Sequence, residues 1–290
     1  MSSSLRLHAP TALEYFAALV AEDAGLNLLE AAASIAQDEY PQLDVQAVLA
    51  EVDGLAARLR RRLPDDAAPS HRLRLLNRYF RDELGFAGNV NNYYERDNSY
   101  LHQVLATRRG IPIALAVIYM ELATQIGLQA RGISFPGHFL VKLHLPQGEV
   151  VLDPFTCRSL SREALEEALQ PYRQRAGREP EGEPPPLELF LQSAAPRQVL
   201  ARMLRNLKEI HRSEQDWPRL LAVQQRLVLL LPDEPSELRD RGLVQEALEH
   251  WSGAQADLQR YLELRPEAPD AAELRARLAR LRERHTPPPH

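Results

Sequence analysis

The amino-acid sequence predicts an α+β fold, in which a helix-rich domain with a small antiparallel sheet is followed by an all-α domain of repeats. Apolar residues recur at helical spacing between about residues 11 and 84, and three short segments within 130–155 alternate as half-buried strands do. Beyond a stretch rich in Pro and Glu, several unlike residue types recur with one 34-residue offset. The expected organisation is a first domain over 1–173 (helices over 11–84, core over 85–160), a linker or exposed loop over 174–186 and a repeat domain over 187–290.

The bulk composition indicates an ordinary globular protein. The chain has 290 residues, enough for two domains, and its 44% apolar and 26% charged residues are typical of soluble proteins. A formal net charge of −5 argues against a general nucleic-acid binder, and no apolar run reaches the roughly 18 residues that a membrane span needs. With a single cysteine, Cys157, and no apolar leader, we expect a cytoplasmic protein without disulfides. The sequence has no Gly-rich phosphate loop, and we expect no cofactor.

The first part of the chain carries the signals of several packed helices. Asp44 is suited to cap a helix, because a short carboxylate accepts hydrogen bonds from the first free backbone N–H groups. The apolar stripe of that helix comprises Val45, Val48, Leu49, Val52, Leu55 and Leu59. Farther along, Ile113–Ile126 is apolar on nearly every side, which predicts a central buried helix, and Gly127 is suited to end it.

A small sheet is predicted after this helix. Its strands are expected near 130–135, 138–145 and 149–155. The segment 138–145 alternates with a period of two, as a strand with one buried face does. Pro146-Gln147-Gly148 supplies the turn into the next strand. This arrangement places His138 on one strand and Asp153 on its partner.

The last third of the chain contains an internal repeat. The 34-residue offset relates Trp217 to Trp251, Arg226 to Arg260, Leu230 to Leu264, Pro232 to Pro266 and Pro235 to Pro269. This is the period of the tetratricopeptide repeat, a helix-turn-helix unit that buries its apolar face against its neighbours. Gly242 and Ala254 fall where that repeat needs small residues for close approach of its helices.

A longer pattern surrounds the predicted sheet. A helix opens at Gly110-Ile111-Pro112, a strand carries His138 and a second strand carries Asp153. In this order the chain resembles the transglutaminase-like superfamily, whose enzymes carry a Cys-His-Asp triad on these elements. With Asn98-Ser99-Tyr100-Leu101-His102 and the repeats, the chain is similar over about residues 25–285 to the bacterial SirB-one family, transglutaminase-like proteins with a tetratricopeptide tail.

The resemblance implies which residues would form the triad. In an active member a thiolate at the N-terminus of the helix is the nucleophile, the His transfers protons and the Asp orients the His. His138 matches the histidine and Asp153 the aspartate. The nucleophile is expected near Pro112, yet no residue from Gly110 to Ala114 has a nucleophilic side chain. Cys157, four residues after Asp153, does not match that position and is a poorly placed substitute nucleophile.

Two functions are compatible with this remnant dyad. In the leading hypothesis His138 and Asp153 only tether two strands, and the chain is a non-catalytic transglutaminase-like protein, acting as a cytoplasmic protein-interaction or regulatory module through its repeats and remnant cleft. In the alternative, the pair serves a hydrolase or acyltransferase of the transglutaminase-like or cysteine-protease type with an unconventional nucleophile. A solvent-accessible His138 bonded to Asp153 would keep the alternative open.

Other polar residues near the predicted cleft have simpler interpretations. His102, His138, Asp153 and Glu95 lack a close ligand spacing such as two His at i and i+4, and we expect no metal site. Ser99 can face the cleft, but it is better suited to cap the helix that follows it.

The repeats suggest a peptide-binding groove. By the phase of the repeat, the groove would be lined by Arg202, Arg205, Glu209 and Arg212 of the first unit and by Arg239 and Glu246 of the second. The arginines are its expected binding residues. Arginine pairs with carboxylates through two parallel hydrogen bonds, which favours an acidic peptide or a C-terminal carboxylate as partner. Two alternatives remain open: these arginines form a solvated helix face, or the repeats dock against the first domain. Neither nucleic acid nor membrane is expected as a partner.

Overall fold

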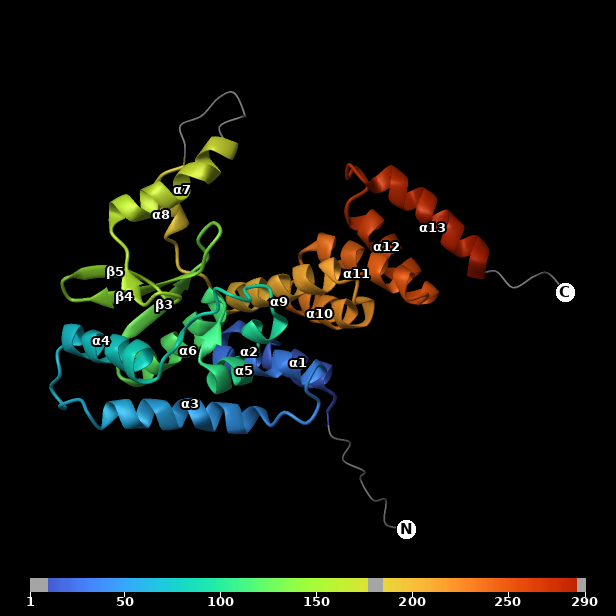
Figure 1. Ribbon diagram of the computed structural model, residues 1–290. Coiled ribbons are helices and arrows are strands. Elements are labelled where there is room, and N and C mark those ends of the chain that lie inside the picture. The colour runs from blue at the N-terminus through green and yellow to red at the C-terminus, as the bar shows by residue number, and fades with distance from the viewer. Residues whose placement is uncertain (1–9, 177–184, 286–290) are drawn as a thin grey trace, which may run out of the picture. The chain divides into compact units, whose positions relative to one another are not determined.

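The computed structural model describes residues 10–176 and 185–285 and divides the chain into two compact units. The core unit is Asp23–Met203, and the repeat unit combines Met1–Glu22 with Leu204–His290. The fold is α+β, as predicted: the core unit holds a small antiparallel sheet among helices, and the repeat unit is helical in the part that is described (Figure 1).

The core unit contains most of the helices that the apolar pattern predicts. They are α2 (Leu28–Ser34), α3 (Val45–Arg60), α4 (Pro69–Asn77), α5 (Leu101–Thr107), α6 (Pro112–Gln125), α7 (Arg162–Ala176), α8 (Leu187–Phe190) and the start of α9 (Pro196–Ser213). Short helical turns of other types are η1 (Asp23–Gly25), η2 (Ile35–Asp38), η3 (Arg78–Glu83) and η4 (Arg96–Ser99). The cap expected for α3 is present, because the Asp44 carboxylate accepts hydrogen bonds from the backbone N–H groups of Gln46 and Ala47.

Two small sheets belong to the core unit. The strands are β1 (Ala87–Gly88), β2 (Arg109–Gly110), β3 (Gln129–Ile133), β4 (Leu140–Leu145), β5 (Gly148–Asp153) and β6 (Arg158–Ser159). β1 and β2 form a short parallel pair, and the other four form an antiparallel sheet in the order β3-β4-β5-β6. In its register Val141 lies opposite both Gly132 and Leu152, so that β4 lies between β3 and β5.

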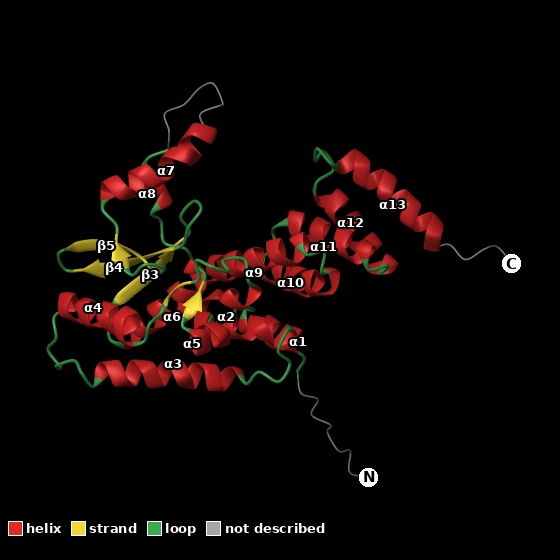
Figure 2. Cartoon of the chain, in the orientation of Figure 1, coloured by secondary structure: helices red, strands yellow, loops and turns green. Residues whose placement is uncertain are grey.

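Helix α6 is the buried centre of the core unit. Pro112 is its first residue, a position where a missing backbone N–H costs nothing. Every residue from Pro112 to Met120 is buried, and Gly127 follows the helix with the positive φ of 77° that glycine adopts readily. Strands β3 and β4 lie against α6 (Figure 2). The prediction of a central buried helix is confirmed.

The repeat unit confirms the 34-residue period. Its helices are α1 (Ala12–Leu19), the rest of α9, α10 (Trp217–Leu230), α11 (Pro235–Ala247), α12 (Trp251–Leu264) and α13 (Ala271–His285). Helices α10 and α12 both begin at a tryptophan and both have 14 residues. They are the second helices of two successive helix pairs, as the repeat requires.

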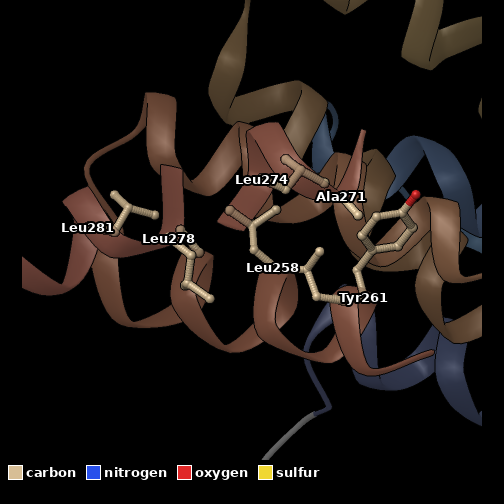
Figure 3. Packing of buried hydrophobic residues seen from close by; sticks show 8 residues of the cluster. Leu258, Tyr261, Ala271, Leu274, Leu278 and Leu281 are labelled. Carbon is tan, nitrogen blue, oxygen red and sulfur yellow. The ribbon is translucent and has the colours of Figure 1, made fainter. Parts of the chain in front are cut away.

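The last helix closes the end of the repeat unit. Leu274, Leu278 and Leu281 of α13 are buried against Leu258 and Tyr261 of α12 (Figure 3). A terminal helix of this kind protects the apolar face that the final repeat would otherwise expose to water.

The N-terminal helix has a partner that the sequence does not reveal. Phe16 of α1 is fully buried, and the guanidinium of Arg226 in α10 lies 5.4 Å from the centre of its ring. Helix α1 therefore packs with the repeat helices, whereas the sequence analysis assigned residues 11–84 together to the first domain. The predicted linker at 174–186 stays a prediction, because 177–184 lie outside the described residues.

We expect Gly242→Val to destabilise the repeat unit. A Cβ on Gly242 would lie 3.0 Å from Leu258 and 3.2 Å from Asp257, so a branched side chain must push α11 away from α12. Overpacking of this kind costs about 1–3 kcal/mol. Urea unfolding followed by tryptophan fluorescence measures it selectively, because both tryptophans of the chain lie in this unit.

The control is Ala247→Val, which places the same branched side chain at an exposed position of the same helix. Equal unfolding midpoints for the two variants would contradict the close approach of α11 and α12.

Candidate functional site: a remnant His-Asp dyad

His138 lies in the turn that precedes β4. The prediction that the strand begins at residue 138 was wrong by two residues, since β4 begins at Leu140. Gly137, with a φ of 70°, bends the chain, and the backbone N–H of His138 donates a hydrogen bond to the carbonyl of Phe135. A Cβ on Gly137 would lie 1.8 Å from the hydroxyl of Tyr172, so the turn also needs glycine for space.

Asp153, at the end of β5, holds the imidazole of His138. Its Oδ1 lies 2.8 Å from Nε2 of His138 and also accepts a hydrogen bond from the backbone N–H of Phe155. Its Oδ2 accepts one from the hydroxyl of Thr156. Burial by itself raises the pKa of Asp153, but the bonds from His138, Thr156 and Phe155 together lower the pKa below its usual value. The carboxylate is therefore ionised at neutral pH.

The other face of the imidazole is open. The Nδ1 atom of His138 makes no hydrogen bond within 10–176 and 185–285, and the side chain is 29% exposed. When Nε2 carries the proton that faces Asp153, Nδ1 is a hydrogen-bond acceptor. The ring of Phe155 lies 6.4 Å away at a steep angle and packs over Gly88, where a Cβ would meet it at 2.0 Å. The dyad thus has one bonded nitrogen and one that a ligand can reach.

The helix N-terminus that would carry a nucleophile has none. Helix α6 starts at Pro112, with Ile111 as the residue before it and no side-chain cap. The backbone N–H of Ile111 donates to the carbonyl of Asn98, and Gly110 pairs with Gly88 of β1. The first residues of α6, near which the resemblance to the superfamily predicts a nucleophile, are therefore apolar.

Cys157 cannot replace the missing thiolate at neutral pH. The residue is buried, with a positive φ of 53°, and its Sγ lies 3.9 Å from the carbonyl oxygen of Pro154. Burial raises the pKa of its thiol to about 12, Asp153 and Asp82 add to the rise, and Arg81 opposes it. A thiol with this pKa stays protonated, and protonated cysteine is a poor nucleophile.

Ser99 and His102 are not part of the dyad. Helix α5 begins at Leu101 with Tyr100 before it, so the expected cap by Ser99 was wrong, and the buried Ser99 hydroxyl has no partner among the described residues. The ring of His102 packs edge-on against Tyr40 at 4.5 Å, and burial lowers its pKa. Across the described segments, no group of three or more His, Cys, Asp or Glu is arranged to hold a metal ion.

Arg202 lies with the core unit. It belongs to the first part of α9, and its Nη1 donates to the hydroxyl of Ser134 (2.8 Å) and to the carbonyl of Phe135 (3.1 Å). Both residues belong to the turn that carries His138. The sequence analysis had assigned Arg202 to the groove of the repeats.

The other three arginines of the predicted groove have intramolecular partners. Arg205 donates to Glu237 at 3.0 and 3.1 Å, Arg239 pairs with Asp240 and Asp270, and Arg212 pairs with Glu209. Glu237 is buried and also accepts a hydrogen bond from Lys208. The positive charges of these three arginines are therefore paired with carboxylates of the same chain.

A pocket of about 460 Å³ opens elsewhere in the core unit. Its walls are α2, α6, β3 and residues 193–199, and its lining includes Met120, Glu121 and Arg131 but neither His138 nor Asp153. The part of the chain that the structure describes has no helix long and apolar enough to cross a membrane.

Comparison with family models identifies the core unit. The model described as "Transglutaminase-like superfamily" matches residues 46–205, more than half of the chain. The chain belongs to the transglutaminase-like superfamily. A second model, of the tetratricopeptide repeat, matches 207–279. No solved structure matches the chain with statistical significance.

Curated relatives confirm the resemblance to the SirB-one family over nearly the whole chain. A UPF0162 protein of Xylella fastidiosa is 39% identical over 261 residues, 90% of this chain and 92% of that protein. A UPF0162 protein of Pseudomonas aeruginosa is 30% identical over 257 residues, 88% and 90% of the two chains. Protein SirB1 of Salmonella typhimurium is 27% identical over 250 residues, 84% and 89%.

Two features of the site were not found by sequence reasoning. Thr156 was overlooked, although a hydroxyl three residues after an aspartate is a common partner within a turn. Tyr172 lies 34 residues from His138 in a different helix, and no local pattern signals their proximity.

We expect Asp153→Asn to destabilise the chain by about 1–3 kcal/mol near neutral pH, because hydrogen bonds to a charged acceptor are lost. The folded-state pKa of Asp153 is lowered, so its stabilisation is present above the unfolded-state pKa and disappears as pH falls through the folded-state pKa. The difference in the free energy of unfolding between Asp153→Asn and wild type should therefore decrease as the pH is lowered. Calorimetric unfolding between about pH 3 and 7 measures it.

The control is Asp66→Asn, at an exposed aspartate of the same unit. A stability difference that stays constant with pH for Asp153→Asn would show that the carboxylate charge does not hold the dyad together.

Proposed function

We propose that the protein is a non-catalytic member of its superfamily that acts as a cytoplasmic protein-interaction or regulatory module. One observation carries the proposal: the helix that would present the nucleophile opens with Ile111, Pro112 and Ile113, and the single thiol of the chain has a pKa of about 12. Without a thiolate, a His-Asp pair has nothing to deprotonate at this position.

Two tetratricopeptide units and a terminal helix supply the interaction surface. Such repeats bind peptides along the first helices of successive units, here α9 and α11. Arg205 and Arg239 belong to these helices, and both are already paired with carboxylates. An acidic partner must therefore compete with internal ion pairs in the groove, and it meets less competition at Arg212, which is 60% exposed.

A second candidate function rests on the open imidazole. His138 is 29% exposed, is bonded to Asp153 through Nε2 and leaves Nδ1 free to accept a proton. This is the state of a general base. The alternative of a hydrolase or acyltransferase therefore remains a hypothesis, and its nucleophile would have to come from outside the helix opening of α6.

An activity screen separates the two functions. We expect the purified protein to show no amidase, esterase or acyl-transfer turnover that depends on His138, because no activated nucleophile accompanies the dyad. Wild type and His138→Ala are compared on panels of amide, ester and thioester substrates. His138→Gln serves as a second variant that keeps a polar side chain of similar size. Turnover that is lost in both variants would overturn the proposal.

Affinity capture tests the repeat surface. We expect the double variant Arg205→Glu with Arg239→Glu to lose the partners that wild type retains, because reversed charge repels an acidic peptide. The matched control is Arg260→Glu with Arg275→Glu, at exposed arginines of α12 and α13. Tryptophan fluorescence confirms that each repeat unit is folded. A partner set that is identical in wild type and the folded double variant would refute the basic groove.

A further inference from the structure

Three polar side chains that the dyad does not use lie around the turn Ser134–His138. Arg202 donates to Ser134 and to the Phe135 carbonyl, and the hydroxyl of Tyr172 rests against Gly137. Tyr93 is near enough to Arg202 that each affects the pKa of the other. The three come from the loop before α5, from α7 and from α9, so that separate parts of the core unit converge on one turn.

Arg202 is a half-buried cation without a carboxylate partner among the described residues. Its contacts are the two hydrogen bonds to the turn and the ring of Phe139, whose centre lies 5.9 Å away. Burial lowers the pKa of Arg202, and only the phenols of Tyr93 and Tyr172 oppose that effect. Removing a cation from water costs free energy that an anion normally offsets. The turn supplies no such anion.

Several other arginines have partners that Arg202 lacks. Arg205, Arg239 and Arg241 all pair with carboxylates. Arg72 has only carbonyl partners, but it uses all three of its nitrogens on them. Among residues 10–176 and 185–285, Arg202 bonds through Nη1 alone, and its Nε and Nη2 have no partner there and are not sealed from solvent.

The free edge of Arg202 has the geometry that carboxylates prefer. Nε and Nη2 point their N–H groups in parallel, which matches the two oxygens of a carboxylate. The Tyr172 hydroxyl makes no hydrogen bond in the described segments and can add another donor. Nη1 of Arg202 and the backbone nitrogen of His138 share the Phe135 carbonyl at 3.1 Å each, so they lie within about 6 Å of each other.

We propose that Arg202, Tyr172 and His138 form a binding site for a carboxylate group of a peptide, which Arg202 holds through Nε and Nη2. One permanent positive charge matches a monoanion, whereas a phosphate ester carries about −1.5 to −2. The ionised Asp153 behind His138 disfavours the extra negative charge. The inference rests on the proposed function, since a protein ligand supplies the carboxylate, and it names what the remnant cleft recognises.

Direct binding of small probes tests the site without any partner protein. N-acetyl-dialanine, its C-terminal amide and inorganic phosphate are titrated into the full-length protein, with affinities measured by ligand-observed NMR. We expect the free acid to bind and the amide to bind at least about tenfold more weakly, the loss expected for one charge-assisted hydrogen bond. Phosphate should bind more weakly than the free acid.

Variants then assign the binding to this turn. Arg202→Gln should weaken binding of the free acid at least about tenfold. Arg202→Lys keeps the positive charge but loses the two parallel N–H donors, and it should weaken binding by less. Arg131→Gln, at an exposed arginine of the same unit, is the matched control and should bind as wild type does. Tyr172→Phe removes one hydroxyl and leaves Arg202 unchanged. If Arg202→Gln does not fold, the affinity of Tyr172→Phe for the free acid tests the site instead.

Several outcomes would refute the proposed carboxylate site. They are no binding by the free acid, equal binding of acid and amide, tighter binding of phosphate, or unchanged affinity in folded Arg202→Gln or, failing that, in Tyr172→Phe. The outcome of the titration is independent of the activity screen. Turnover that depends on His138 would refute the proposed function but would not affect the measured carboxylate binding. Conversely, a failed titration would leave the non-catalytic assignment standing.

Discussion

The burial of α6 from Pro112 to Met120 is the constraint on which the rest of the core unit depends. A helix that is apolar all round must be covered all round, and α2, α3, α5 and the strands β3 and β4 provide that cover. Because the helix cannot rotate or slide without exposing apolar surface, the place of its N-terminus is fixed as well. Pro112, which the resemblance to the superfamily places near the expected nucleophile position, is therefore held at a fixed point of the core unit.

The dyad persists for a related reason. Asp153 accepts hydrogen bonds from three donors, and His138 is only one of them. The other two, Phe155 and Thr156, shape the turn after β5, and that turn places the ring of Phe155 over Gly88. An aspartate with this structural task is needed whether or not the neighbouring histidine transfers protons. The hydrogen bond between His138 and Asp153 is therefore not by itself evidence of catalysis.

Local and periodic features of the fold could be predicted from the sequence, and long-range pairings could not. The cap at Asp44, the buried α6 and the 34-residue repeat each follow from spacing within one segment. The packing of Phe16 on Arg226 joins residues 210 positions apart, for which no periodicity exists. The same limit applies to the site: the histidine and the aspartate could be found from the order of strands, but the hydroxyl of Tyr172 could not.

The arginines show why helical phase alone does not identify a binding surface. By phase, Arg202, Arg205 and Arg239 are all expected to face the groove, but the neighbouring carboxylates differ. A ligand that takes Arg205 from Glu237 leaves a carboxylate with 3% exposure paired with Lys208 alone, so part of the gain in binding is cancelled. A ligand at Arg202 displaces only water, because Nε and Nη2 have no protein partner among the described residues. The proposed recognition of a carboxylate is therefore expected to gain more free energy at Arg202 than at Arg205.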